Sequence, residues 1–234
     1  RPREAAEAYQ RALRLVGGQS PDIALKVAEM LLAAGDVADA VAHAELAKSL
    51  PGAHAVLAKV ALDRGDHARA LAEARLAGTT AGEGLLGPLS VWLAAAERHG
   101  EVVALLEPVG EKASPPILAL LGQAFFDLGR YQQAETVASR ALAIDPTSPR
   151  ANEVLGNVLL RLERPADGMR HLAAAIAKAP RLATAWNSLG VARYQLGDVN
   201  AAMEAWQRAS ALDPALFDAL FNLGLVAAEA RQTA

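Results

Sequence analysis

The chain has 234 residues, of which 53% are hydrophobic but only 4% are aromatic, with no cysteine and a formal net charge of −3 at pH 7. The charge gives no general attraction to nucleic acid or to an anionic membrane surface, no apolar run approaches the ~18–20 residues that span a bilayer, and the lack of cysteine excludes disulfides, thiolate metal sites and cysteine nucleophiles. A core built mainly from Ala, Leu and Val favours an all-α fold, and we predict neither nucleic-acid binding nor direct membrane insertion.

The first 77 residues are predicted to form helices that alternate with short turns. Residues 3–15 have the pattern of the second helix of a pair whose first helix is missing, so we assign 1–20 to a partial repeat. Gly-Asp dipeptides that begin at Gly35 and Gly65 mark the turns of two further pairs. We place these two degenerate repeats together at 21–77.

A glycine-rich stretch, GTTAGEGLLGP, follows at 78–88 and is predicted to interrupt the array as a joint between two half-arrays. It lacks the Lys of a phosphate-binding loop. The pair that comes after it has Trp92 in its first helix and Gly100 as a turn residue, and Pro108 is expected to cut its second helix short. We assign 78–114 to a glycine-rich joint and a degenerate repeat.

From residue 115 onward the chain repeats with a period of 34 residues. Leu-Gly recurs at Leu121-Gly122, Leu155-Gly156, Leu189-Gly190 and Leu223-Gly224, and Pro146, Pro180 and Pro214 keep the same interval. A fixed period of 20–50 residues is typical of stacked supersecondary units. We assign 115–216 to three complete repeats and 217–234 to the first helix of a further repeat or to a cap.

Residues 115–148 indicate how one repeat is built. Gly129 stands where the first helix should end, as a left-handed cap residue would. Pro146 ends the second helix, because Pro cannot continue a helix. In the next repeat Pro165 is suited to opening the second helix.

The pattern resembles the tetratricopeptide repeat (TPR), whose signature has a large residue at position 4, Leu-Gly at 7 and 8, an aromatic at 11, Ala at 20, an aromatic at 24, Ala at 27 and Pro at 32. In 183–216 these positions hold Trp186, Leu189, Gly190, Arg193, Ala202, Trp206, Ala209 and Pro214, so that only position 11 departs. The resemblance is close over 115–224 and weaker before it. It implies a right-handed α-solenoid of antiparallel helix pairs, the TPR superhelix.

Glycine recurs at position 8 of the repeat, inside the first helix. Gly costs ~1 kcal/mol relative to Ala in a helix, so its recurrence predicts a close approach of the two helices of each pair. The glycines are Gly122, Gly156, Gly190 and Gly224. We expect Ala134 and Ala202 to face them across the pair.

No arrangement of residues predicts catalysis, a metal site or a cofactor. The five histidines, His43, His54, His67, His99 and His171, are scattered without the spacing of a metalloprotease helix. A nucleophile elbow and a phosphate-binding glycine loop are both missing from the sequence. We therefore predict that the chain is not an enzyme and needs no cofactor.

The resemblance implies that the first helices line a concave groove, chiefly through positions 2, 5, 6, 9, 12 and 13. Amide side chains there can hold a peptide backbone by paired donors and acceptors, and Tyr and Arg are favoured contact residues at interfaces. We predict a groove that binds a protein or peptide partner through Gln123, Phe126, Glu153, Asn157, Arg161, Asn187, Tyr194 and Asn222.

Three uses of such a protein are open at this point. The favoured one is a non-catalytic scaffold that binds a protein segment in its concave groove. The second is an accessory repeat region of a larger enzyme, for example a transferase or hydrolase, because both ends look like incomplete pairs with an uncovered apolar face. The third is a scaffold that self-associates through its terminal helices. The frequent Ala and Arg favour a bacterial source with GC-rich DNA.

Overall fold

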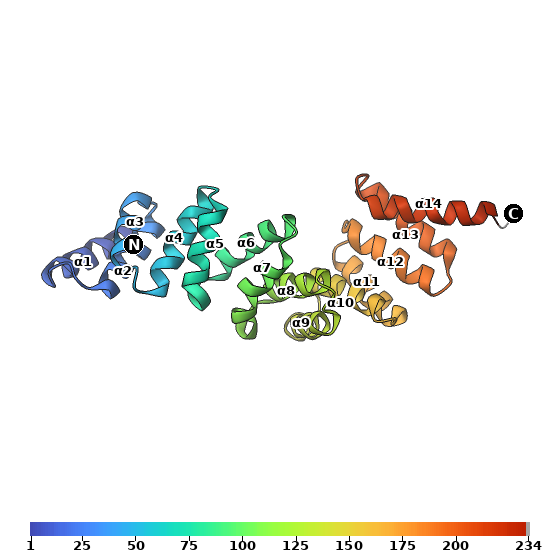
Figure 1. Cartoon of the computed structure of the whole chain (residues 1–234), viewed down its shortest axis with the longest axis horizontal. Coiled ribbons are helices and arrows are strands. Elements are labelled where there is room, and N and C mark those ends of the chain that lie inside the picture. The colour runs from blue at the N-terminus through green and yellow to red at the C-terminus, as the bar shows by residue number, and fades with distance from the viewer. Residues whose placement is uncertain (233–234) are drawn as a thin grey trace. The chain divides into compact units, whose positions relative to one another are not determined.

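The computed structural model describes residues 1–232 and consists of α-helices joined by short turns (Figure 1). Those residues form 14 α-helices, packed as consecutive pairs, with two short 3-10 helices and no strands. The prediction of an all-α array of helix pairs is confirmed. Contacts divide the chain into two compact units, Arg1–Glu111 (unit 1) and Lys112–Ala234 (unit 2). The last two residues of the predicted element 217–234 lie outside the described residues.

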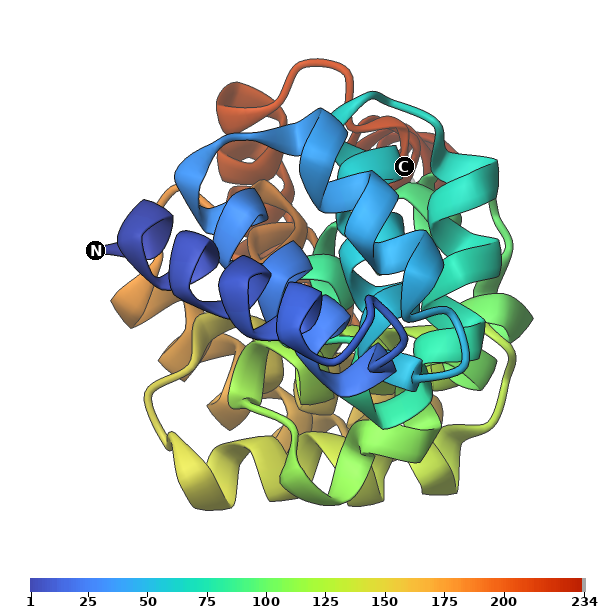
Figure 2. The same cartoon turned by 90° about the vertical axis from the view of Figure 1, so that its left-hand side faces the viewer.

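Unit 1 begins with a single helix, which is followed by three pairs. Its helices are α1 (Pro2–Leu15), α2 (Pro21–Ala34), α3 (Val37–Leu46), α4 (Pro51–Asp63), α5 (His67–Ala77), α6 (Glu83–Ala95) and α7 (His99–Leu106), with 3-10 turns at Gly78–Thr80 and Glu107–Lys112. Figure 2 views this unit from the end at which α1 lies. There α1 packs on α2, and Ala6 shares a buried cluster with Val27 and Leu31.

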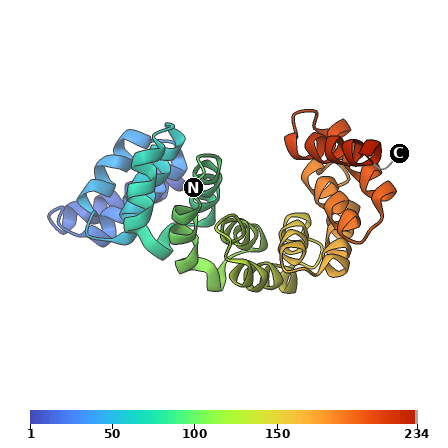
Figure 3. The ribbon, with the colours of Figure 1, turned by 45° about the vertical axis from the view of Figure 1, so that its right-hand side comes forward.

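Unit 2 contains three pairs and a final helix. It is coloured from green to red in Figure 3. Its helices are α8 (Pro115–Asp127), α9 (Tyr131–Ile144), α10 (Pro149–Arg161), α11 (Pro165–Lys178), α12 (Ala183–Gln195), α13 (Val199–Leu212) and α14 (Phe217–Gln232). The pairs are α8–α9, α10–α11 and α12–α13, and α14 packs on α13. Alanines such as Ala134, Ala138 and Ala141 are fully buried, which lets the helices approach closely.

The turn inside each pair requires a residue with positive φ. Gly129 has φ +72°, and the N–H of Arg130 donates to the carbonyl of Phe125 at 2.8 Å across the turn. The left-handed cap predicted at Gly129 is confirmed. In the next pair Glu163 takes this conformation with φ +58°, which is strained for a residue with a Cβ atom, and Pro165 then opens α11 as predicted.

Prolines determine where two second helices end. Helix α9 ends at Ile144, shortly before Pro146, and α7 ends at Leu106, after which Pro108 lies in a 3-10 turn. Both ends agree with the sequence predictions.

The stretch 78–88 is partly helical. Helix α6 begins at Glu83 and continues through Pro88. The N–H that Pro88 lacks would have bonded to the carbonyl of Gly84, so α6 loses only a hydrogen bond of its first turn. The buried Leu89 packs the helix against its neighbours. Within 78–88 only the part before Glu83 departs from α-helix.

The glycines at position 8 lie at helix crossings in two pairs. A Cβ atom on Gly122 would be 3.7 Å from the carbonyl oxygen of Ala134, and one on Gly156 would be 3.2 Å from that of Gly168. The predicted close approach is confirmed at these two glycines.

Two parts of the glycine prediction are corrected. At Gly190 the nearest atoms belong to the indole of Trp206 and not to Ala202, because the large ring fills the space above the glycine. At Gly224 no atom lies within 4 Å of a Cβ position, because no helix follows α14 within residues 1–232.

Candidate functional site

The candidate binding surface of unit 2 consists of the residues at positions 2, 5, 6, 9, 12 and 13 of α8, α10, α12 and α14. We call it the first-helix surface. All eight residues predicted to bind a partner belong to these four helices. Their contacts show which of them the fold brings together.

Asn187 and Asn222 meet between α12 and α14. The Nδ2 of Asn222 donates to Oδ1 of Asn187 at 3.3 Å, and both side chains are half-buried. The backbone carbonyl of Asn187 also accepts a hydrogen bond of 3.1 Å from the indole N–H of Trp206. The two amides thus form one polar patch that spans two successive first helices.

Phe126 and Arg161 are brought together by Tyr131, the first residue of α9. The rings of Phe126 and Tyr131 lie 5.7 Å apart, and the guanidinium carbon of Arg161 lies 5.4 Å from the centre of the Tyr131 ring. A cation above the face of an aromatic ring is attracted to it. Tyr131 was missed by the sequence reasoning because it lies on a second helix, at a position without a repeat pattern.

The remaining predicted residues differ in how their side chains are engaged. Asn157 is half-buried, and its amide has no hydrogen bond to any described residue. Gln123 donates to Asp127 at 2.9 Å, and the ring of Tyr194 lies 5.9 Å from that of Trp206. Asn157 is therefore the one predicted amide that keeps its full hydrogen-bonding capacity within residues 1–232.

Glu153 does not lie on the accessible surface. Its side chain is 2% exposed, and its carboxylate accepts a hydrogen bond of 2.5 Å from Arg150 on one oxygen and a bond from the Thr184 hydroxyl on the other. The prediction that Glu153 contacts a partner is corrected, because a buried carboxylate with both oxygens engaged joins α10 to α12 instead.

Unit 1 has a cavity on the corresponding side of its first helices. It has a volume of about 550 Å³ and lies between α2 and α4. Its lining includes positions 2, 5, 9 and 12 of α2 and positions 2, 5 and 6 of α4, which are Asp22, Leu25, Glu29, Leu32, Gly52, Ala55 and Val56. The sequence reasoning placed no site here because the repeat pattern is weaker in this half of the chain.

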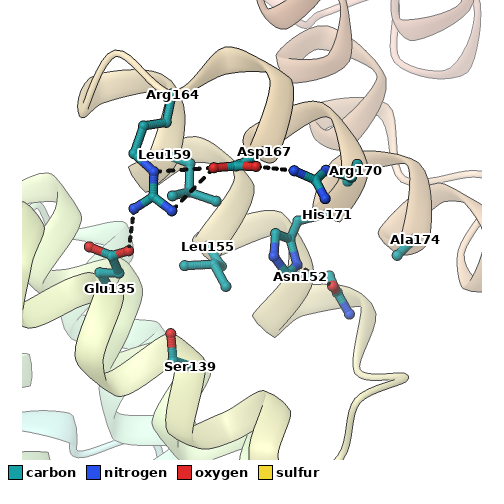
Figure 4. A pocket seen from close by; sticks show the side chains of 10 residues that line it. All are labelled: Glu135, Ser139, Asn152, Leu155, Leu159, Arg164, Asp167, Arg170, His171 and Ala174. Carbon is teal, nitrogen blue, oxygen red and sulfur yellow. Dashed lines mark hydrogen bonds and ion pairs between the residues drawn. The ribbon is translucent and has the colours of Figure 1, made fainter.

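A second cavity, of about 570 Å³, lies on the other side of unit 2 (Figure 4). Leu155 and Leu159 of α10 line it between α9 and α11. At its rim Arg164 donates to Glu135 at 2.8 Å and to Asp167 at 3.2 Å.

Asn152, which lines the cavity, occupies position 4 of its repeat, where Trp186 stands in the next one. Both side chains donate to the carbonyl of the proline that closes the preceding repeat, Asn152 to Pro146 at 3.1 Å and Trp186 to Pro180 at 2.9 Å. The smaller amide thus makes the same hydrogen bond as the indole of Trp186.

His171 lines this cavity beside Asn152. Its Nδ1 lies 2.9 Å from Oδ1 of Asn152, whose Nδ2 is used in donating to two backbone carbonyls, so His171 is the donor. Burial lowers the pKa of His171 below its ordinary 6.5, and the nearby charge of Arg170 adds to this effect.

The charges around this cavity cancel. Arg164 and Arg170 are matched by Glu135 and Asp167, and the hydrogen bond from Arg164 lowers the pKa of Asp167 so that it stays ionised. The cavity thus favours ions of neither sign. Across residues 1–232 no group of three or more His, Cys, Asp or Glu side chains could hold a metal ion.

No helix in the described part of the chain is both long and apolar enough to cross a membrane.

Comparison with protein families finds three matches along the chain. Models described as "Tetratricopeptide repeat" match residues 1–54 and 115–158, and a model described as "TPR repeat" matches residues 192–229. Together these matches cover more than half of the sequence. No curated protein sequence matches the chain.

Solved structures agree with the family matches. MamA from residue 41 to its end, from Desulfovibrio magneticus RS-1, is 29% identical with a TM-score of 0.52, and the alignment covers 63% of this chain and 85% of MamA. YrrB, "a TPR protein with an unusual peptide-binding site", is 18% identical with a TM-score of 0.52 over 93% of this chain and 98% of YrrB, which shows a shared fold. With the helix pairs, the repeat signature and these matches, the chain belongs to the tetratricopeptide repeat family.

Proposed function

We propose that the protein is a non-catalytic scaffold that binds an extended segment of a partner protein along its first helices. The TPR fold is typically non-catalytic, and no catalytic family model matches the chain. The proposal covers two places, the cavity of unit 1 and the first-helix surface of unit 2.

The cavity between α2 and α4 is the observation that carries the proposal. Residues at positions 2, 5 and 9 of the repeat line it, and these are the positions at which the family resemblance implies partner contacts. Leu25 and Val56 give it an apolar floor, and the carboxylate of Asp22 has no ion-pair partner among the described residues. This chemistry suits a segment in which an apolar side chain is followed or preceded by a basic one.

Unit 2 is proposed to contact the backbone of the same kind of segment. The free amide of Asn157 offers a donor and an acceptor, which matches the peptide group. Arg161 lies over the ring of Tyr131, and Tyr194 is half-buried. Both side chains add contact area, and because they are already held in place, they lose little further conformational entropy on binding. Gln123, Phe126, Asn187 and Asn222 complete the proposed surface, and Glu153 acts behind it as a positioning residue.

One structural relative supports this use of the fold. YrrB is described as having a peptide-binding site, and it shares the fold over nearly the whole chain. That description supports peptide binding as a use of this fold, whereas the residues proposed above are argued from the structure of this chain alone.

The test begins with peptides selected from a displayed library of random sequences, using the folded chain as bait. Fluorescence anisotropy then gives the Kd of a selected peptide for each variant. We expect the double variant Asn157→Ala, Tyr194→Ala to bind about tenfold or more weakly, equivalent to roughly 1.4 kcal/mol. Ala55→Arg, which would fill the unit 1 cavity, is expected to weaken binding as well.

Gln207→Ala is the matched control, because it removes an exposed amide from a second helix. Circular dichroism checks that every variant is folded. If peptide affinity is unchanged in both the Asn157/Tyr194 double variant and Ala55→Arg, the partner does not bind along the first helices.

A further inference from the structure

The cavity of unit 2 shown in Figure 4 has no role in the proposed binding along the first helices. Its volume of about 570 Å³ lies within the range of ~300–1,000 Å³ that is usual for small-molecule sites. Leu155 and Leu159 of α10 are 6% and 2% exposed and give the cavity an apolar floor. Such a cavity is suited to a small molecule when a few polar groups accompany the apolar wall.

The corresponding positions of the next repeat pack with an indole ring. Trp186 packs against a buried cluster that includes Leu189 and Ala205. By the 34-residue period, these two residues are the counterparts of Leu155 and His171, which line the cavity. Positions that pack with an aromatic ring in one repeat therefore line an open cavity in the repeat before it.

His171 supplies a hydrogen-bond acceptor at the wall of this cavity. Its Nδ1–H donates to Oδ1 of Asn152, so the neutral ring keeps a lone pair on Nε2. Burial lowers the pKa of His171, which favours this neutral form at neutral pH. No residue within 1–232 forms a hydrogen bond with Nε2, and Figure 4 shows the ring projecting from α11 toward Leu155. A ligand in the cavity can therefore donate a hydrogen bond to Nε2.

The rim of the cavity favours an uncharged ligand. Arg164 lies 2.8 Å from Glu135 and 3.2 Å from Asp167. Arg170 forms a further ion pair with Asp167. A charged ligand would have to compete with one of these ion pairs for its partner. A neutral molecule leaves the ion pairs intact and gains free energy by burying its apolar surface.

We propose that this cavity binds a small, uncharged aromatic molecule with one hydrogen-bond donor, of the size and type of indole. The ring lies on Leu155 and Leu159, and its N–H donates to Nε2 of His171. The ring matches the apolar floor, the donor matches the imidazole acceptor, and the lack of charge matches the paired rim. The inference is independent of the proposed peptide binding, because the cavity lies on the other side of unit 2 from the first-helix surface.

The test is an NMR titration of the 234-residue chain with indole as the probe. The backbone amide signals of Ser139, Leu155 and Ala174, which line the cavity, report binding there. We expect these signals to shift until saturation, with a Kd of about 1 mM or lower. N-methylindole has the same ring but no N–H. It should bind about three- to tenfold more weakly, because it cannot donate to His171.

Two variants separate the contribution of the ring from that of the donor. In the double variant Asn152→Trp, His171→Ala, both positions hold the residues of the next repeat, so the indole of the chain itself should fill the cavity and abolish the shifts. In His171→Phe a ring remains without the acceptor, so indole and N-methylindole should bind with the same, weaker affinity. Gln207→Trp, which adds an indole at an exposed position of α13, is the control and should bind indole like the unchanged chain.

Three results would overturn the proposal. One is a lack of saturable shifts at the three amides up to the solubility limit of indole, in a chain that is folded by circular dichroism. Another is equal affinity of the unchanged chain for indole and N-methylindole. The third is undiminished binding of indole by the folded double variant. If a blocked Gly-Trp-Gly peptide shifts the signals where free indole does not, the occupant is a side chain of a partner protein and the proposal is likewise wrong.

Discussion

At the scale of single residues, Gly190 and Trp206 show how one missing Cβ atom positions a large ring. A Cβ atom on Gly190 would lie 2.6 Å from Cδ1 of Trp206, closer than packed carbon atoms approach. The indole N–H meanwhile donates to the carbonyl of Asn187 at 3.1 Å. The ring is thus fixed by its close contact with Gly190 and by the hydrogen bond from its N–H.

We predict that Gly190→Leu lowers the free energy of unfolding by about 1–3 kcal/mol, because the added side chain must displace Trp206. Urea unfolding followed by circular dichroism measures the change. The matched variant Gly224→Leu, at a position with no atom within 4 Å, should unfold like the unchanged chain at low protein concentration. Equal effects of the two substitutions would contradict the packing described for Gly190.

His171 is the residue for which the structure predicts a pH effect. Since its pKa is lowered on folding, chiefly by burial, the unfolded chain takes up the proton first as the pH falls. The stability contributed by neutral His171 is present above its ordinary pKa of 6.5 and is lost as the pH falls from there through the lower pKa of the folded state.

NMR titration of the imidazole signals should give a pKa below 6.5 for His171 in the folded chain. In Asn152→Ala, which removes the acceptor of its Nδ1–H, the imidazole signals of His171 should shift more than those of His67 in unit 1, which stacks on Trp92. A pKa at or above 6.5 in the unchanged chain would show that His171 is not buried as described.

At the scale of helices, polar pairs replace apolar contacts in two of the pairs. His54 lies 2.7 Å from Glu73 between α4 and α5, and Asn152 lies 2.9 Å from His171 between α10 and α11. In both cases the partners are nineteen residues apart, at positions 4 and 23 of the repeat. Positions 4 and 23 of the repeat can thus hold two polar side chains, because the hydrogen bond between them satisfies both side chains inside the helix pair.

The buried carboxylate of Glu153, which joins α10 to α12, gives a prediction about helix packing. Glu153→Ala removes the acceptor of both Arg150 and Thr184 and leaves a space at a fully buried position. We expect the free energy of unfolding to fall by about 1–3 kcal/mol in urea unfolding. Arg150→Ala should cost less than about 1 kcal/mol, because the Arg150 side chain is 58% exposed and its charge stays solvated. A larger loss of unfolding free energy for Arg150→Ala than for Glu153→Ala would contradict this interpretation.

At the scale of the whole molecule, the chain consists of two units, each with its own buried residues. In a repeat array each pair contacts only its neighbours, so a run of pairs is stable without distant parts of the chain. The repeat boundaries drawn from the sequence, with a joint within 78–114, remain our proposal for where such runs can be separated.

We predict that residues 112–234 fold when expressed alone. The fragment should have the circular dichroism spectrum of a helical protein and should unfold cooperatively in urea, because it contains three complete pairs with the strongest repeat signature. Residues 1–111 serve as the companion fragment. An unfolded spectrum for 112–234 would mean that unit 2 depends on contacts from unit 1.

The sequence by itself determined the helices of unit 2, their turns and their ends. These features depend on local chemistry, such as the positive φ of Gly129 and the missing N–H of Pro146, and local chemistry is readable one residue at a time. The period of 34 residues then identified the array, because each pair meets the next in the same register.

The tertiary structure decided which side chains fill the spaces between helices. Trp206 covers Gly190 from a different helix, Glu153 is buried by partners on both of its carboxylate oxygens, and the cavity on the first helices opens in unit 1, where the signature is weak. These outcomes depend on the sizes and polarities of side chains that lie far apart in the sequence. No local sequence pattern encodes the combined effect of such distant side chains. These contacts and this cavity could therefore be identified only in the folded chain.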